Sequence, residues 1–387
     1  MYSPHLFSSF FMGGFECSSH RRPDGRRLDM LASTGHDRLV ASDYRHMLAH
    51  GMRTVRDGLR WHLIETTPGL YDWSSFLPAL HAARDTGLQV IWDLCHYGWP
   101  DDIDIWTPEF VDRFGRFAAA AATLVRDETD GVPFYCPVNE ISYWAWAGGD
   151  VGRMNPCTRD RGHELKQQLI RASIAAMEAV RDVDRRARFI HVEPAINVIA
   201  QPDRPQDIEA ADSYRCSQWQ AWDLLSGALS PELGGKPDYL DILGLNYYSS
   251  NQWYYDGGVV PMGHHSYCPF RYMLAETYHR YERPLLVAET GAEGTARPAW
   301  LHYVADEVRA ALAAGVAVEG ICLYPVLDYP GWENERSCNV GLLSPVPGSD
   351  ERAVCGLLAE ELRRQQAILE DMLKGGARRF SVVSMAG

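Results

Sequence analysis

The sequence predicts an α/β protein, a single (β/α)8 TIM barrel. The main observation is a recurring pattern in which a helical segment ends at a glycine and an apolar, β-rich run follows within a few residues. Eight such runs follow one another at roughly the spacing of one helix-plus-strand unit, and no Pro/Gly/Ser-rich linker divides them. Eight consecutive β-then-α units are typical of a closed parallel barrel.

The predicted strands are distributed along the whole chain. In order they lie within residues 6–16, 50–61, 86–97, 130–140, 187–194, 238–248, 283–290 and 314–324. The glycines expected to end the preceding helices are Gly51, Gly87, Gly131 and Gly315. We place the barrel domain in residues 1–375 and a flexible C-terminal tail in residues 376–387.

Helix signals support this alternation. Thr107 is expected as an N-cap, with Pro108 at the first helical position and Glu109 in the first turn. Residues 164–182 form a second helical stretch. An open, doubly wound sheet would use the same units, but the segment after the first strand, GGFECSSHRRPDG, lacks both the GxGxxG and the P-loop pattern that such a sheet uses for nucleotides.

Composition excludes several classes of partner. Lys and Arg number 37 against 51 Asp and Glu, a net charge of −14, which disfavours nucleic acid. No apolar run is long enough to cross a membrane and no signal peptide is recognisable, so a cytoplasmic location is the expectation. The nine cysteines include no CxxC pair and are expected to be reduced thiols. His264, His265 and Cys268 lack the spacing of a metal site, so we expect no metal and no cofactor. Assembly into a homo-oligomer is possible from the sequence.

Polar and ionisable residues stand at the end of every predicted strand, where parallel barrels build their active sites. In chain order these are Glu16, Arg56, His96, Asn139 with Glu140, Glu193, Asn246 with Tyr247 and Tyr248, Glu289, and the segment 324–328. Cleavage of a glycosidic bond needs one carboxylic acid and a second carboxylate. Glu140 and Glu289, on the fourth and seventh strands, are the candidates.

At these motifs the chain resembles glycoside hydrolase family 1, the β-glucosidase-like retaining enzymes. Asn139-Glu140 matches the family's acid/base motif, and residues 288–291 match its nucleophile motif around Glu289. Residues from Leu243 match the strand-six motif, and VRDGLRW matches the strand-two motif that contains Arg56. His96 falls at a sugar-binding histidine, and Trp332 is in register with the tryptophan of the strand-eight loop.

The resemblance implies a role for each matched residue. Glu289 would be the nucleophile, held by Arg56 and by a hydroxyl of Tyr247 or Tyr248, and Glu140 the acid/base. The remaining predicted substrate contacts are His96, Asn139, Asn246, Tyr324 and Trp332, with Trp144 or Trp99 as further aromatic candidates.

The sequence departs from the family where the sugar would be held. Arg21 is taken to stand at the family's sugar-binding Gln, Gly331 at its sugar-binding Glu, Tyr324 at a tryptophan, and Tyr97 at the residue after the histidine. Arg21, Arg22, Arg26 and Arg27 therefore suggest either an anion-binding loop or a solvated loop paired with its own acidic residues. The expected function is a retaining β-glycosidase with an altered sugar pocket that acts on a small glycoside or an oligosaccharide. A transglycosidase and a catalytically silent, carbohydrate-binding barrel are the alternatives.

Overall fold

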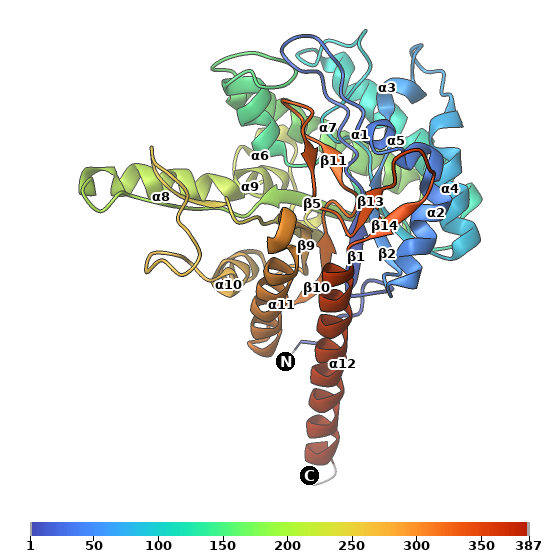
Figure 1. Ribbon diagram of the computed structural model, residues 1–387. Helices are drawn as coiled ribbons and strands as arrows, with labels where there is room; N and C mark the ends of the chain where they lie inside the picture. Colours follow the sequence, from blue (N-terminus) through green and yellow to red (C-terminus); the bar gives the residue numbers. More distant parts are fainter. Residues whose placement is uncertain (1, 385–387) are drawn as a thin grey trace.

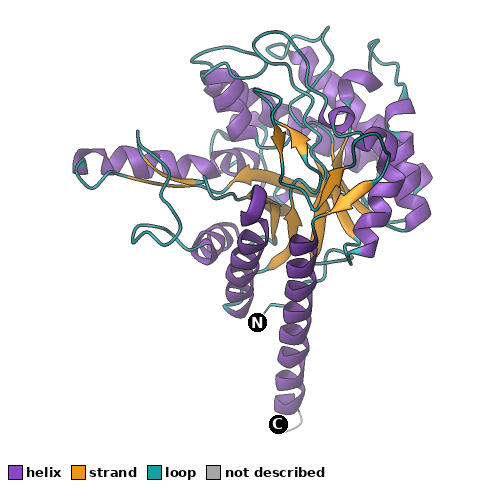
Figure 2. Cartoon of the chain, in the orientation of Figure 1, coloured by secondary structure: helices purple, strands orange, loops and turns teal. Residues whose placement is uncertain are grey.

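The computed structural model describes the backbone of residues 2–384 and the side chains of residues 2–374. Its centre is a closed barrel of eight parallel strands surrounded by helices (Figures 1 and 2). The strand order around the barrel is β1-β10-β9-β7-β5-β4-β3-β2. The strands are β1 (Phe11–Gly14), β2 (Thr54–Gly58), β3 (Gln89–Asp93), β4 (Phe134–Cys136), β5 (Arg188–Pro194), β7 (Ile242–Asn246), β9 (Leu285–Thr290) and β10 (Val318–Leu323). Each of the eight predicted runs contains one of them, so the predicted barrel is confirmed.

Helices follow the strands and cover the outside of the barrel. The longer ones are α2 (His36–Ala49), α4 (Leu77–Thr86), α5 (Pro108–Glu128), α7 (Gly162–Val183), α8 (Ile208–Cys216), α9 (Gln220–Leu225), α10 (Phe270–Tyr281), α11 (Arg297–Ala313) and α12 (Gly356–Ser384). Short helices α1 (Met30–Ser33), α3 (Trp61–Ile64) and α6 (Ile141–Trp144) lie in loops at the carboxyl ends of strands. In Figure 1, α8 projects sideways from the barrel and α12 extends past its lower end.

The local helix signals are confirmed in part. Thr107 is the N-cap residue of α5, but its hydroxyl donates to the carbonyl of Asp104 and makes no capping hydrogen bond. Gly87 ends α4 in the left-handed conformation, as expected. Gly131 was the wrong choice for a helix end, because α5 stops at Glu128 and Gly131 is not among the glycines with positive φ.

Three small two-stranded sheets were not predicted. They are β6 (Asn197–Ile199) with β8 (Gln252–Tyr254), β11 (Tyr329–Pro330) with β12 (Ser337–Cys338), and β13 (Leu343–Pro345) with β14 (Arg352–Val354). All three are formed by segments outside the barrel strands.

The interior of the barrel is packed with apolar side chains. Met12, Ile91, Phe134, Ile190 and Leu286, one from each of five strands, belong to a single buried cluster. Such filling is usual for an eight-stranded barrel and leaves room for a ligand only at its mouth.

A buried charged network fastens the C-terminal hairpin to the barrel. His36 lies between two carboxylates, with Nδ1 2.8 Å from Asp43 Oδ2 and Nε2 2.9 Å from Asp57 Oδ2. Arg352, on β14, donates two hydrogen bonds to Asp43. Although burial opposes it, the neighbouring carboxylates raise the pKa of His36 to about 9.

No helix within residues 2–384 is long and apolar enough to cross a membrane. All nine cysteines lie in this described part, where each is a free thiol and five are buried. The domain bounds and the flexibility of the tail at 376–387 stay predictions: the backbone up to Ser384 belongs to α12, and residues 385–387 lie outside the described residues. Cytoplasmic location and oligomeric state also stay predictions.

Candidate active site

A cavity of about 1370 Å³ opens at the carboxyl ends of the barrel strands. Six predicted site residues line it: His96, Glu140, Tyr248, Glu289, Tyr324 and Trp332. Arg56, Asn139 and Asn246 are buried beside it, each at most 1% exposed, and hydrogen-bond to groups that line it. Of the ten predicted site residues, the structure leaves only Arg21 away from this group.

Glu289 sits near the end of β9, and its carboxylate accepts two hydrogen bonds. Arg56 Nη1 donates to Oε1 at 2.8 Å, and the Tyr248 hydroxyl donates to Oε2 at 2.9 Å. The structure thus resolves the choice between two tyrosines, since the hydroxyl of Tyr247 instead pairs with that of Tyr267 at 2.6 Å. Burial raises the pKa of Glu289 to about 7, while Arg56 opposes the rise and the nearby Glu140 adds to it.

Arg56 is fixed by a second carboxylate below the cavity. Its Nε and Nη2 donate to the two oxygens of Asp93, at 2.9 and 2.7 Å, in a bidentate pair. Nη2 also donates to Asn139 Oδ1 at 2.6 Å. Asp93 was not among the predicted site residues, although it is the last residue of β3 and therefore stands at a strand end.

Asn139 makes all its side-chain hydrogen bonds within the protein. Because Oδ1 accepts from Arg56, Nδ2 is the donor to His96 Nε2 at 3.0 Å and to the Tyr97 hydroxyl at 2.8 Å. His96 Nδ1 faces Asp93 Oδ2 at 2.9 Å and therefore carries the ring hydrogen. Asn139 thus orients Arg56, His96 and Tyr97, and the direct sugar contact that the resemblance implied stays a prediction.

Glu140 follows β4 in a backbone conformation that few non-glycine residues adopt. Its φ is 43°, and that of Tyr97, its hydrogen-bond partner, is 68°. The Tyr97 hydroxyl donates to Glu140 Oε2 at 2.6 Å, and Asn246 Nδ2 donates to Oε1 at 2.8 Å. Left-handed backbone at such residues is costly and is concentrated at functional sites. In the sequence, Tyr97 stood out only because it differs from the residue that usually follows the histidine in the family. Its contact with Glu140 was not predicted.

Glu193, at the end of β5, holds the segment that follows Glu140. Both of its oxygens accept from the backbone N–H of Ser142, at 3.2 and 3.1 Å. Burial raises the pKa of Glu193 to about 8, and the Lys166 ammonium opposes this rise. Glu193 is 1% exposed and acts on the site through α6.

Cys17, Asp93 and His96 bring three potential metal-ligand atoms within 4.8 Å of one another. Their chemistry suits hydrogen bonding better than metal binding. Both oxygens of Asp93 already receive the guanidinium of Arg56, and burial raises the pKa of the Cys17 thiol well above its usual value, which keeps it protonated.

Several buried polar atoms around the cavity lack a hydrogen-bond partner in the described part of the chain. They are Ser18 Oγ, His20 Nδ1, Ser142 Oγ, Asn246 Oδ1, Tyr324 Oη and Trp332 Nε1. Buried polar groups are nearly always hydrogen-bonded, so these atoms are available to a polar ligand or to water. Three of the six residues, Ser142, Tyr324 and Trp332, line the cavity itself.

The loop after β1 differs from the sequence-based expectation. Arg21 forms an ion pair with Asp101 and does not line the cavity, whereas the preceding residue, His20, packs edge-on against Trp332 at 4.7 Å between ring centroids. The other three arginines of the loop are also paired, Arg22 with Asp24, Arg26 with Glu335 and Arg27 with Asp101. Arg21 therefore lies away from the cavity, contrary to the prediction that it contacts substrate. The four arginines are paired, as the alternative expected, but only Arg22 pairs with an acidic residue of the same loop.

The aromatic lining also differs from expectation. Trp144 is fully buried, its Nε1 donates to the carbonyl of Asn155, and like Trp99 it is part of the apolar core. Tyr143 and Trp146, on either side of it in sequence, line the cavity. Which aromatic residue of the run YWAW faces the cavity depends on how the helix is rotated about its axis, and the sequence did not fix this rotation.

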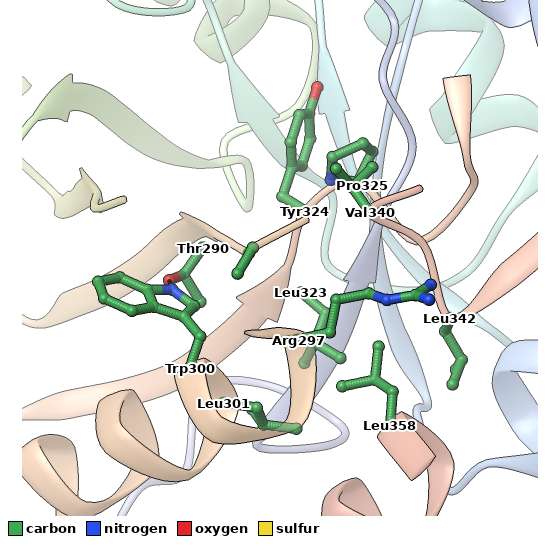
Figure 3. A pocket seen from close by; sticks show the side chains of 12 residues that line it. Thr290, Arg297, Trp300, Leu301, Leu323, Tyr324, Pro325, Val340, Leu342 and Leu358 are labelled. Carbon is green, nitrogen blue, oxygen red and sulfur yellow. Dashed lines mark hydrogen bonds between the residues drawn. The ribbon is translucent and has the colours of Figure 1, made fainter. Parts of the chain in front are cut away.

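A second, much smaller space of about 20 Å³ lies behind the site (Figure 3). It is bounded by Trp300, Leu301 and Leu358, and the Tyr324 hydroxyl points away from these side chains. Trp300 Nε1 donates to Thr290 Oγ1 at 2.9 Å. A volume of this size holds about one water molecule and no sugar.

No protein-family model matches this sequence, and no curated protein matches it. Solved structures do match in fold. A family 1 β-glucosidase from Thermotoga maritima has a TM-score of 0.76 at 15% identity, covering 93% of this chain and 98% of its own. The same enzyme in complex with glucoimidazole gives the same values. A hyperthermophilic β-glucosidase mutant, dodecameric in its crystal, has a TM-score of 0.74 at 16% identity and coverages of 91% and 98%. At these identities the likeness shows the fold.

Proposed function

We propose that this chain is a retaining β-glycosidase, a divergent member of glycoside hydrolase family 1. The observation that carries the proposal is the unequal environment of two carboxyl groups in one cavity. Glu289 receives the cation of Arg56 and a hydroxyl hydrogen bond, whereas Glu140 receives neutral donors only. In this proposal Glu289, beside the cation, acts as the carboxylate nucleophile, and Glu140, which receives only neutral donors, acts as the acid/base. The pair is thus prepared as one nucleophile and one acid.

The chemistry proceeds in two displacements. In the first, a carboxylate oxygen of Glu289 attacks the anomeric carbon, the bond to the leaving oxygen breaks, and the proton of Glu140 passes to that oxygen. In the second, the carboxylate of Glu140 takes a proton from water, the resulting oxygen attacks the anomeric carbon, and Glu289 is released as a carboxylate. Atoms and charges balance over the cycle, which consumes one water.

The substrate class follows from the cavity. The unpaired hydroxyl, amide and indole groups at its wall suit a polyhydroxylated ligand, and Tyr143 and Trp146 offer aromatic faces for a pyranose. Its volume of about 1370 Å³ exceeds that of most small-molecule sites, about 300–1,000 Å³, so an oligosaccharide or a glycoside with a large aglycone fits.

The test is trapping of the covalent intermediate. The protein is incubated with activated 2-deoxy-2-fluoro glycosides of several sugars, and the intact mass is measured. We expect a mass increase equal to one fluoroglycosyl group, mapping to Glu289 after proteolysis and lost in Glu289→Ala. No adduct and no turnover across the panel, with sugars still binding, would instead support a silent carbohydrate-binding barrel. Adduct formation with products that carry the sugar on an added alcohol would assign a transglycosidase.

A further inference from the structure

A third carboxyl group faces the proposed active site. Glu16 lies two residues after β1, is 7% exposed and lines the same cavity as Glu140 and Glu289. Its one hydrogen bond within the protein is accepted by Oε1 from the backbone N–H of Ser18 at 3.0 Å. The described residues provide no lysine or arginine that pairs with it.

The cations near Glu16 are committed elsewhere. Arg56 is shared by Asp93 and Glu289. The four arginines of the loop after β1 pair with carboxylates outside the cavity. His96 Nε2 lies 4.0 Å from Glu16 Oε1, beyond hydrogen-bond distance, and is 3.0 Å from Asn139 Nδ2, while its Nδ1 faces Asp93. A shielded carboxylate without a cation is unfavourable, and a cationic ligand group would remove this cost.

Unpartnered side chains next to Glu16 indicate that a ligand completes this part of the cavity. The Tyr324 hydroxyl, on a residue 2% exposed that lines the cavity, has no partner. Neither has Nδ1 of His20, also 2% exposed, nor Nε1 of Trp332, against which His20 packs. These groups suit the hydroxyls of a sugar, and the carboxylate of Glu16 suits a substituent that carries positive charge.

The backbone around Glu16 packs closely on two glycines, Gly58 at the end of β2 and Gly98 in the loop after β3. A Cβ at Gly58 would lie 2.4 Å from Cys17 Sγ, and one at Gly98 would lie 2.6 Å from the carbonyl oxygen of Ser19. The segment that carries Glu16 therefore packs directly on the end of β2 and on the loop after β3. Glu16 is a fixed part of the cavity wall and not a side chain on a loose loop.

We infer that Glu16 binds a protonated amine on the sugar, so that the substrates are glycosides of aminodeoxy sugars. The inference rests on the proposed glycosidase function and narrows its substrate class. An ammonium donates up to three hydrogen bonds and neutralises the carboxylate, whereas a hydroxyl would leave the negative charge in place.

The test compares 4-nitrophenyl β-glucoside with its 2-, 3-, 4- and 6-aminodeoxy analogues, which share one leaving group. We expect kcat/KM for one amino analogue to exceed that for the glucoside by about tenfold or more, the advantage of a charge-assisted hydrogen bond. N-acetylation at that position should abolish the advantage. Glu16→Gln should lower the ratio of kcat/KM for the amino substrate to kcat/KM for the glucoside by about tenfold or more. The matched control is Glu333→Gln, which removes the same charge from an exposed position one residue after Trp332 and should change neither value.

The outcomes separate this inference from the proposed function. Equal or better turnover of the neutral glucoside, or a Glu16→Gln variant that keeps the amine preference, overturns the inference and leaves the glycosidase standing. Failure of all glycosides, with no covalent adduct, overturns the proposed function. If Glu16→Gln does not fold, the effect of N-acetylation on the wild type and the kinetics of Glu16→Asp, which keeps the charge, decide the question.

Discussion

Removal of the hydroxyl from Tyr248 tests the proposed nucleophile most directly. Tyr248→Phe deletes one of the two hydrogen bonds to Glu289, the one at 2.9 Å to Oε2, and leaves the Arg56 contact at 2.8 Å in place. A hydrogen bond to a charged group contributes about 1.5–3 kcal/mol. Loss of that amount from the state in which Glu289 is ionised lowers kcat/KM by about 10- to 150-fold.

The same change affects the pH profile in a defined direction. Burial already raises the pKa of Glu289 to about 7, and the nucleophile must be ionised. Activity of the wild type should therefore fall as the pH drops through the neutral range. Without the hydroxyl the pKa of Glu289 rises further, so the acidic limb of the profile moves to higher pH. The assay is kcat/KM from pH 5 to 9 with an activated aryl glycoside.

Tyr247→Phe is the matched control. Tyr247 is buried beside Tyr248 in sequence, but its hydroxyl contacts Tyr267 and Gln252, and its ring stacks on Phe270 at 4.0 Å. This variant should lose some thermal stability and keep both kcat/KM and the position of the acidic limb. Equal kinetic effects of the two substitutions, or no effect of Tyr248→Phe, would refute the assignment of Glu289 as the nucleophile.

Three further predictions concern stability and packing. The pKa of Glu193 is raised to about 8, so its ionisation opposes folding as the pH rises. The Glu193→Gln variant should therefore melt at or above the wild-type temperature at pH 9. A clearly lower melting temperature in calorimetry would contradict this. The raised pKa of His36, about 9, means that its stabilising contribution is complete below about pH 6.5 and is lost as the pH rises through 9. His36→Gln should therefore cost about 3–5 kcal/mol in urea denaturation at pH 6 and markedly less at pH 10, and a pH-independent cost would be inconsistent with the charged pair. A Cβ at Gly14 would lie 2.2 Å from Tyr324 Cδ2. Gly14→Ala should therefore lower the free energy of unfolding by about 1–3 kcal/mol and reduce kcat/KM by displacing that ring. Unchanged kinetics would show that the position of the ring does not matter for activity.

The fold was predictable because each barrel strand is a local signal. A run such as QVIWD follows a helix end at Gly87 and is buried on both faces, which is the pattern of a parallel strand. The small sheets were missed because strands of two or three residues, such as β11 at Tyr329–Pro330, carry no periodicity.

The candidate site was predictable to the extent that its residues end strands. Glu140, Glu289 and Arg56 met this condition, and the structure brings them together. Arg21 was also predicted but lies away from them, because no pattern fixes the register of the loop after β1. Likewise, the hydrogen bond from Tyr97 to Glu140 joins positions 43 residues apart and depends on two left-handed backbone conformations. Contacts of this kind arise only from the assembled barrel.

The pairing of β1 with β10 determines when, during folding, one part of the cavity wall can form. This ladder, with Phe11 opposite Ile321 and Gly13 opposite Leu323, joins the first and the last barrel strand of the sequence. Glu16 follows β1 and Tyr324 follows β10, so the part of the cavity wall that they line together can form only after this ladder has formed. Ladders between sequence-distant strands are slow to form. A ligand that contacts both Glu16 and Tyr324 would stabilise the β1–β10 ladder. Its binding should therefore slow hydrogen exchange at the amides of β1 and β10 more than at those of any other strand pair.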